Sequence, residues 1–135
     1  MMRFFFKTSL QTILIFTLML AITGCSNSPQ SAQRKIDKIA KDIKTELPKM
    51  LDNDTRLVSV YTKKLELVSE YELINYEPTE TSSSLIKKKI EFYLKKQVCP
   101  DIKIELLDKG ISSRYIYKAK NGEILLDWLL SPGDC

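Results

Sequence analysis

The chain offers three cysteine thiols for chemistry and contains no histidine. The thiols are those of Cys25, Cys99 and Cys135. A thiol can be acylated, oxidised to a disulfide or used as a nucleophile, and the last role needs an activating neighbour that is often a histidine. Without histidine, neither a Cys-His nor a Ser-His-Asp arrangement can form. Acylation and disulfide formation are therefore the reactions that these cysteines favour.

Cys25 ends a segment that is built like an export signal. Arg3 and Lys7 make its start basic, and no acidic residue precedes Asp37. The apolar run over residues 13–22 is shorter than the roughly 20 residues that span a bilayer. A cleaved signal peptide fits this pattern better than the alternative, a plain transmembrane anchor with an incidental cysteine.

Residues 22–25 read Ile-Thr-Gly-Cys, which resembles the lipobox of bacterial lipoproteins. The resemblance covers residues 1–25 and implies a signal peptide over 1–24, acylation of Cys25 by chains such as palmitate, and anchoring in a bilayer of the bacterial cell envelope. More than one acyl chain makes such an anchor stable. Ser26 takes the place where an aspartate would favour inner-membrane retention in enteric bacteria. We therefore expect the outer membrane, with the domain facing the periplasm.

The charge and length of the remaining chain suit one exported domain. Arg3 and Lys7 leave with the signal, so the mature chain is closer to neutral than the formal net charge of +4 suggests. We therefore expect no nucleic-acid partner. The small polar residues after Cys25 predict a flexible tether over 25–33, followed by a single domain over 34–135.

The apolar pattern predicts a two-layer α+β domain with the element order α-β-β-α-(α)-β-β. The expected helices cover 34–47, Ser82 to about 98 and 100–109, and the expected hairpins cover 55–62 with 65–76 and lie within 112–130. Asn121-Gly122 is the turn signal of the second hairpin. Alternation of apolar residues also allows a strand over 100–109. We expect one four-stranded antiparallel sheet with the helices on one face.

Particular side chains are expected to fill the core of this domain. The second helix should turn five apolar residues inward: Ile86, Ile90, Tyr93, Leu94 and Val98. The last strand should turn four inward: Ile124, Leu126, Trp128 and Leu130.

Cys99 and Cys135 are the two thiols that remain once Cys25 is acylated. Two cysteines in an exported domain most simply pair, and this pair would hold the end of the chain against the second helix. A redox pair is the alternative, but the two lie too far apart for a Cys-x-x-Cys motif. A zinc site from these thiols and carboxylates has no further support, and we expect no metal.

The outer face of the sheet is expected to combine ion pairs with apolar residues. Three acids of one strand (Glu66, Glu70 and Glu72) would meet three cations of another (Arg114, Lys118 and Lys120) if the strands are neighbours. Four apolar residues would share this face: Val68, Ile116, Leu125 and Leu129. Such a patch would suit a protein partner, although a tail or loop of the chain could equally cover it.

The second helix also carries a basic face, formed by Lys87, Lys88, Lys95 and Lys96. Lysines near an anionic bilayer are each attracted by about 1 kcal/mol. A solvated helix face is the alternative interpretation.

A wider set of short segments gives a second resemblance. The segments are Glu46-Leu47-Pro48-Lys49-Met50, Asp54-Thr55-Arg56-Leu57, Val98-Cys99, Leu106-Leu107-Asp108-Lys109-Gly110, Arg114-Tyr115-Ile116-Tyr117, Asn121-Gly122 and Asp134-Cys135. In these segments, the mature chain is similar to a group of small uncharacterised exported proteins of Gram-negative bacteria. The resemblance supports the fold and the disulfide, and it implies no activity.

The sequence points to a binding protein rather than an enzyme. It has no Walker A motif and no G-x-G-x-x-G loop, so we expect no nucleotide cofactor. We expect a non-enzymatic, envelope-anchored accessory factor of the assembly, secretion, immunity or exclusion type, with an envelope protein as partner. The alternative is a structural lipoprotein that binds lipid headgroups or peptidoglycan through the basic helix.

Overall fold

The computed structural model describes residues 28–135, apart from the side chains of residues 80–82. The expected signal peptide over 1–24, Cys25 and the start of the expected tether lie outside these residues. Within the described part, no helix is both long enough and apolar enough to cross a bilayer.

Helix α2 spans Pro29–Lys44 and begins within the expected tether. The Ser28 hydroxyl oxygen caps it by accepting a hydrogen bond from the backbone N–H of Ser31 at 3.3 Å. Pro29 occupies the first turn, where its missing N–H costs nothing. Residues 29–33 are therefore helical rather than a flexible tether, because this cap and proline start the helix before its apolar stripe.

The sheet has five strands and is mixed, which corrects the expected four-stranded antiparallel sheet. The strands are β1 (Lys49–Met50), β2 (Thr55–Thr62), β3 (Glu66–Leu73), β4 (Ser112–Ala119) and β5 (Ile124–Leu130), paired in that order. Both expected hairpins are present, but β3 and β4 pair in parallel. The helical crossover between them returns the chain to the end where β3 began, so β4 runs in the same direction.

The crossover contains two helices with a π-helical turn between them. Helix α3 spans Glu80–Tyr93, the π-turn spans Leu94–Val98 and helix α4 spans Cys99–Glu105. A short 3-10 helix over Leu107–Lys109 ends at Gly110, whose φ of 76° is left-handed. The segment 100–109 is thus helical, as expected, and the strand alternative is wrong.

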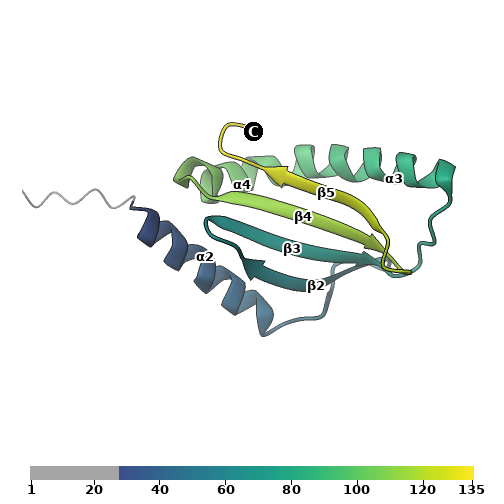
Figure 1. The fold of residues 1–135 in the computed structure, drawn as a ribbon, viewed down its shortest axis with the longest axis horizontal. Coiled ribbons are helices and arrows are strands. Elements are labelled where there is room, and N and C mark those ends of the chain that lie inside the picture. The colour runs from purple at the N-terminus through teal and green to yellow at the C-terminus, as the bar shows by residue number, and fades with distance from the viewer. Residues whose placement is uncertain (1–27) are drawn as a thin grey trace, which may run out of the picture.

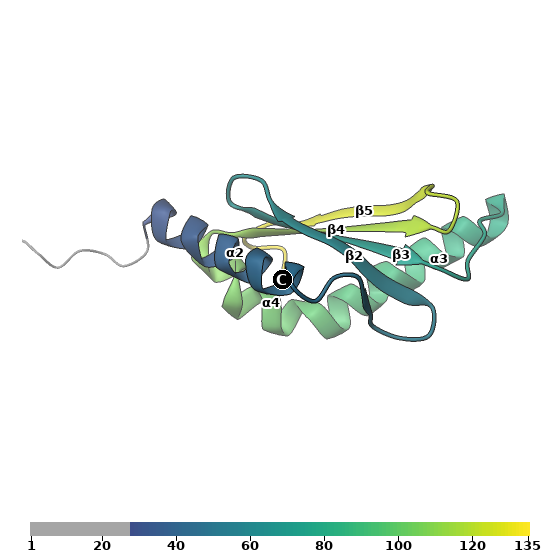
Figure 2. The same ribbon diagram turned by 90° about the horizontal axis from the view of Figure 1, so that it is seen from below.

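The helices that the structure describes cover one face of the sheet, so the domain has the expected two layers (Figures 1 and 2). Beneath α2, Ile36 packs against Val60 and other side chains of β2 and β3. Beneath the crossover, Leu94 packs against Tyr115 and other side chains of β4 and β5. Ile124, expected in the core, is 57% exposed. A bulge near the start of β5 breaks the alternation, and Leu125 is buried in its place.

Candidate functional site

A groove lies between α3 and the loop that joins β1 to β2. It consists of two adjoining cavities of about 310 and 340 Å³. Both are lined by Leu73, Lys89 and Ile90. The first also touches Leu51, Asp52, Thr55, Tyr93 and Tyr117, and the second also touches Asp54, Asn75, Tyr76 and Ile86. We call these two cavities together the α3 groove.

Stacked aromatic rings form the floor of the α3 groove and the core below it. The rings of Tyr71 and Tyr117 stack with centroids 4.6 Å apart, and Tyr115 lies 6.3 Å from Tyr71. Burial raises the pKa of Tyr71 to about 12 and also raises the pKa of Tyr117. These phenols stay neutral at physiological pH, so the floor offers an apolar surface and no acid–base pair.

The loop that forms the opposite wall is held in place by Asp52. Its carboxylate accepts hydrogen bonds from the backbone N–H groups of Asp54 and Thr55 at 2.8 and 2.7 Å. These bonds, with that of Asp54 first, lower the pKa of Asp52. Asp54 in turn accepts a hydrogen bond from the Asn75 amide at 2.8 Å. The wall therefore has a fixed shape even though it lies outside the helices and strands.

Apolar side chains are exposed on both rims of the α3 groove. Leu51 is 51% exposed on the loop side, and Tyr93 is 58% exposed on α3. Tyr93 was expected in the core, and its exposure corrects that expectation. Ile86 and Ile90 of α3 are only half-buried, whereas Leu94, the first residue of the π-turn, is fully buried. The groove is open where Ile86 and Ile90 are not fully covered by the sheet.

No signal in the sequence identifies the α3 groove. Periodicity assigns Ile86, Ile90 and Tyr93 to the inner face of α3, and it contains no information on how closely that face approaches the sheet. The loop residues of the opposite wall are distant in the sequence and have no motif of their own.

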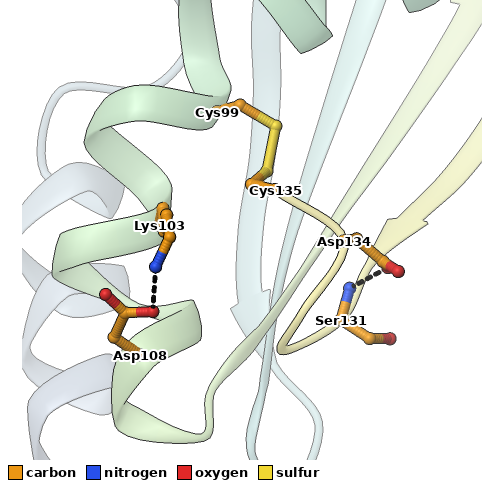
Figure 3. The surroundings of a disulfide bond; sticks show 6 residues. All are labelled: Cys99, Lys103, Asp108, Ser131, Asp134 and Cys135. Atoms are coloured by element: carbon orange, nitrogen blue, oxygen red, sulfur yellow. Dashed lines mark hydrogen bonds and ion pairs between the residues drawn. A yellow bond between two sulfur atoms is a disulfide. The ribbon is translucent and has the colours of Figure 1, made fainter.

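The disulfide between Cys99 and Cys135 is present, with Cα atoms 5.6 Å apart. It joins the segment that follows β5 to the first residue of α4 (Figure 3). The tail between β5 and Cys135 is further held where the backbone N–H of Ser131 donates to the Asp134 carboxylate at 2.7 Å (Figure 3). The two cysteines therefore cross-link the segment after β5 to helix α4. Cys25, the expected acylation site, lies outside the described residues.

Ion pairs dominate the outer face of the sheet. Arg114 Nε lies 2.6 Å from Glu66 Oε1, and Lys118 Nζ lies 2.7 Å from Glu70 Oε2. These two pairs confirm the expected contact between acids of β3 and cations of β4. Glu72 instead meets Arg56 of β2 at 2.6 Å, and Lys120 lies 3.9 Å from Glu77.

The four apolar residues expected to form a partner patch do not make an exposed surface. Val68 and Leu125 are buried, Ile116 is half-buried and Leu129 is exposed. Val68 lies opposite Arg114 in the parallel register, between the ion pairs of Glu66 and Glu70. Long charged side chains cover apolar surface with their methylene stems while their ends stay in water. The outer face is therefore charged rather than apolar.

The four lysines of the expected basic face are all exposed on α3 and the π-turn. Their side chains have different neighbours. Lys95 Nζ lies 6.0 Å from the Trp128 ring of β5, whereas Lys96 Nζ lies 5.9 Å from the Phe92 ring of α3. Lys88 is on the same side of α3 as Phe92, and Lys87 is on the flank toward Leu94.

Residues 28–135 contain no group of three or more acids and cysteines close enough to hold a metal ion. Two features of the described residues face solvent in a way that suits contact with another molecule: the α3 groove and the solvent-facing side of α3.

Comparison with known proteins shows a pilotin-like fold. No family model and no curated protein sequence matches the chain. Two similar solved structures are pilotins of type 2 secretion systems: EpsS of Vibrio vulnificus and AspS of Vibrio cholerae. EpsS aligns with a TM-score of 0.59 and 12% identity, and AspS with 0.56 and 20%; each alignment covers 79% of this chain and 94% of the pilotin.

A third similar structure is a candidate secreted protein of Pseudomonas aeruginosa. It aligns with a TM-score of 0.64 and 15% identity over 83% of this chain and 99% of that protein. At these identities the likeness is one of fold. Because the alignments cover almost the whole of each neighbour, the complete domain is shared rather than a single motif.

Proposed function

We propose that this chain is an envelope-anchored, non-enzymatic accessory lipoprotein, of the kind that pilotins represent, and that it binds a protein partner through the α3 groove. Acylated Cys25 would hold it in the bilayer, as the lipobox indicates. Ser26 favours the outer membrane and a periplasmic domain. The pilotin-like fold supports the secretion type of accessory factor over the assembly, immunity and exclusion types.

The observation that carries this proposal is the open apolar recess with exposed rims. Apolar recesses of this kind accept apolar side chains of an extended or helical segment. Leu51 and Tyr93 stand on opposite rims and are both about half exposed, so a partner segment lying between them would cover both. Tyrosine is also enriched among residues that contribute most to protein interfaces.

The surrounding structure suits a preformed binding site. The Asp52 hydrogen bonds fix one wall, and the stacked tyrosines fix the floor. A partner would then lose little free energy to ordering of the groove itself, which favours affinity.

Site-specific photocrosslinking in intact cells tests the proposal. Benzoylphenylalanine in place of Leu51 or Tyr93 should give the same protein adduct at both positions, because both rims would face one partner. The same reporter in place of Ile124 is the matched control, since Ile124 is also exposed but belongs to β5. Adducts at all three positions, or none at either rim, would contradict groove binding.

A binding measurement with the partner identified by that adduct makes the test quantitative. Changing both Leu51 and Tyr93 to alanine should weaken binding by at least about tenfold if they are anchor residues. Both side chains are exposed, so the domain should remain folded. Ile124→Ala should leave the affinity unchanged.

A further inference from the structure

The solvent-facing side of α3 combines exposed apolar residues with lysines. Leu85 is 57% exposed and Phe92 is 68% exposed. They are seven residues apart, which places them two turns apart on one side of the helix. Lys88 lies between them in the helix, and Lys96 Nζ sits 5.9 Å from the Phe92 ring. We call these four residues the basic–aromatic face.

The segment 83–98, which contains most of α3 and the π-turn, carries an excess of positive charge. Residues 83–98 contain five lysines and one acid, Glu91. In the part of the chain that the structure describes, none of these five lysines forms an ion pair. Arg114 and Lys118 on the outer face of the sheet are, by contrast, paired with acids. The exposed lysines of α3 and the π-turn therefore remain available to anions, whereas Arg114 and Lys118 already have acidic partners.

We propose that the basic–aromatic face lies on an anionic phospholipid bilayer, with Phe92 and Leu85 entering the headgroup region and Lys88 and Lys96 contacting lipid phosphates. Interfacial helices combine apolar side chains at the boundary with lysines around them in this way. We assign a bilayer to this face because anionic headgroups complement the charge of its exposed lysines. No observation indicates a protein surface of matching charge.

The position of α3 in the fold permits this contact. The helices form the layer on one side of the sheet (Figure 2). The side of α3 that faces away from the sheet is therefore open to a flat surface. The α3 groove is lined by different α3 residues, among them Ile86, Ile90 and Tyr93. A bilayer contact and a protein partner can therefore be accommodated together. The inference rests on the proposed lipid anchor, which would keep the domain near the bilayer.

Tryptophan fluorescence of the full chain in vesicles tests the contact. Trp128 is the single native tryptophan, so Trp128→Phe provides a silent background. Phe92→Trp then reports the basic–aromatic face, and Ile124→Trp is the matched control on the exposed end of β5. In phosphatidylglycerol-containing vesicles with brominated acyl chains, we expect several-fold stronger quenching at position 92 than at position 124. In pure phosphatidylcholine vesicles this difference should largely disappear.

Charge reversal distinguishes contact through the basic–aromatic face from attachment through the lipid anchor alone. Each lysine near an anionic surface changes the docked population by about fivefold, so Lys88→Glu with Lys96→Glu should abolish the excess quenching at position 92. Lys63→Glu with Lys120→Glu makes the same change of net charge elsewhere and should preserve it. Equal quenching at positions 92 and 124, or quenching that survives the reversal at Lys88 and Lys96, would overturn the proposal.

A crosslinking experiment tests whether a protein, rather than a bilayer, covers this face. Benzoylphenylalanine in place of Phe92 should give lipid adducts in cells, and a protein adduct there would overturn the bilayer assignment. Failure of this inference leaves the crosslinks from Leu51 and Tyr93 unchanged. Loss of those crosslinks with quenching intact would instead overturn the groove proposal.

Discussion

Arg114 on β4 lies beside Glu66 on β3, with an Nε–Oε1 distance of 2.6 Å. The contact depends on the parallel pairing, in which Glu66 is opposite Ser112 and Arg114 is two residues further along its strand. Arg114 also reaches across to Asp127 on β5 at 2.8 Å. One guanidinium thus links three adjacent strands on the outer face, and its hydrogen bonds to Glu66 and Asp127 raise the pKa of Arg114.

Replacing Arg114 with alanine should lower the free energy of unfolding by about 1–3 kcal/mol. The change would leave the partly buried Glu66 without its partner and remove the stem that lies opposite Val68. Urea denaturation followed by circular dichroism measures the effect. Lys120→Ala is the control, because its contact with Glu77 is 3.9 Å long and exposed, and it should change stability by less than about 0.5 kcal/mol. Equal effects of the two variants would refute a stabilising role for the Arg114 link.

Reduction of the Cys99–Cys135 bond should destabilise the domain by about 2–4 kcal/mol, because the bond restricts the unfolded chain. Denaturation with and without dithiothreitol measures this loss. The double variant Cys99→Ser with Cys135→Ser should match the reduced protein and be insensitive to dithiothreitol. A double variant as stable as the oxidised protein would show that the bond adds nothing.

Stability should fall at high pH because of the buried tyrosines. The pKa of Tyr71 is about 12 in the folded protein, against about 10 in an unfolded chain. The neutral phenol is favoured by folding, so its contribution is complete below pH 10 and is lost as the pH rises toward 12. The loss is about 1.4 kcal/mol per pH unit for one such group.

The change Tyr71→Phe isolates this effect from the lysines that titrate in the same range. The variant keeps the ring but has no proton to lose, so its stability should decline less than that of the native protein between pH 10 and 12. Unfolding curves at several pH values measure the difference. Parallel declines of the two proteins would contradict the raised pKa of Tyr71.

Replacing Cys25 with serine should abolish labelling by radioactive palmitate in growing cells. Serine has no thiol to accept the diacylglyceryl group, so the unprocessed chain should accumulate with its signal peptide still attached. Gel electrophoresis and fluorography measure both effects. Cys99→Ser is the control and should retain the label. Labelling that persists in Cys25→Ser would refute the lipobox assignment.

Local patterns in the sequence predicted the elements well. The strand over 55–62, the hairpin turn at Asn121-Gly122 and the short helix beginning near Pro100 all lie where the residues indicate. Each depends on neighbours within a few residues: alternation, a glycine in a tight turn, or a proline in a first helical turn. The ion pairs of β3 and β4 were also anticipated, because charges of opposite sign occupy one face of each strand.

Pairing between distant elements was harder to predict. Two hairpins can join in parallel or antiparallel, and the hairpins themselves contain no information on which will occur. The alternation of residues assigns Val68 and Leu125 to an exposed patch, but it does not show that both are buried in the folded domain or that Arg114 lies opposite Val68. Periodicity assigns Ile124 and Tyr93 to the core, but a bulge in β5 exposes Ile124, and Tyr93 is exposed at the rim of the α3 groove.

The sequence by itself predicted an export signal with acylation of Cys25, predicted the pairing of Cys99 with Cys135, and excluded a histidine-based catalytic site from this chain, because each of these depends on which residues are present. Only the tertiary structure decided that β3 and β4 are parallel, that ionic side chains cover the outer face, and that α3 stands far enough from the sheet to leave a groove. Those features depend on how separate segments pack together, and packing distance is not encoded in any local pattern.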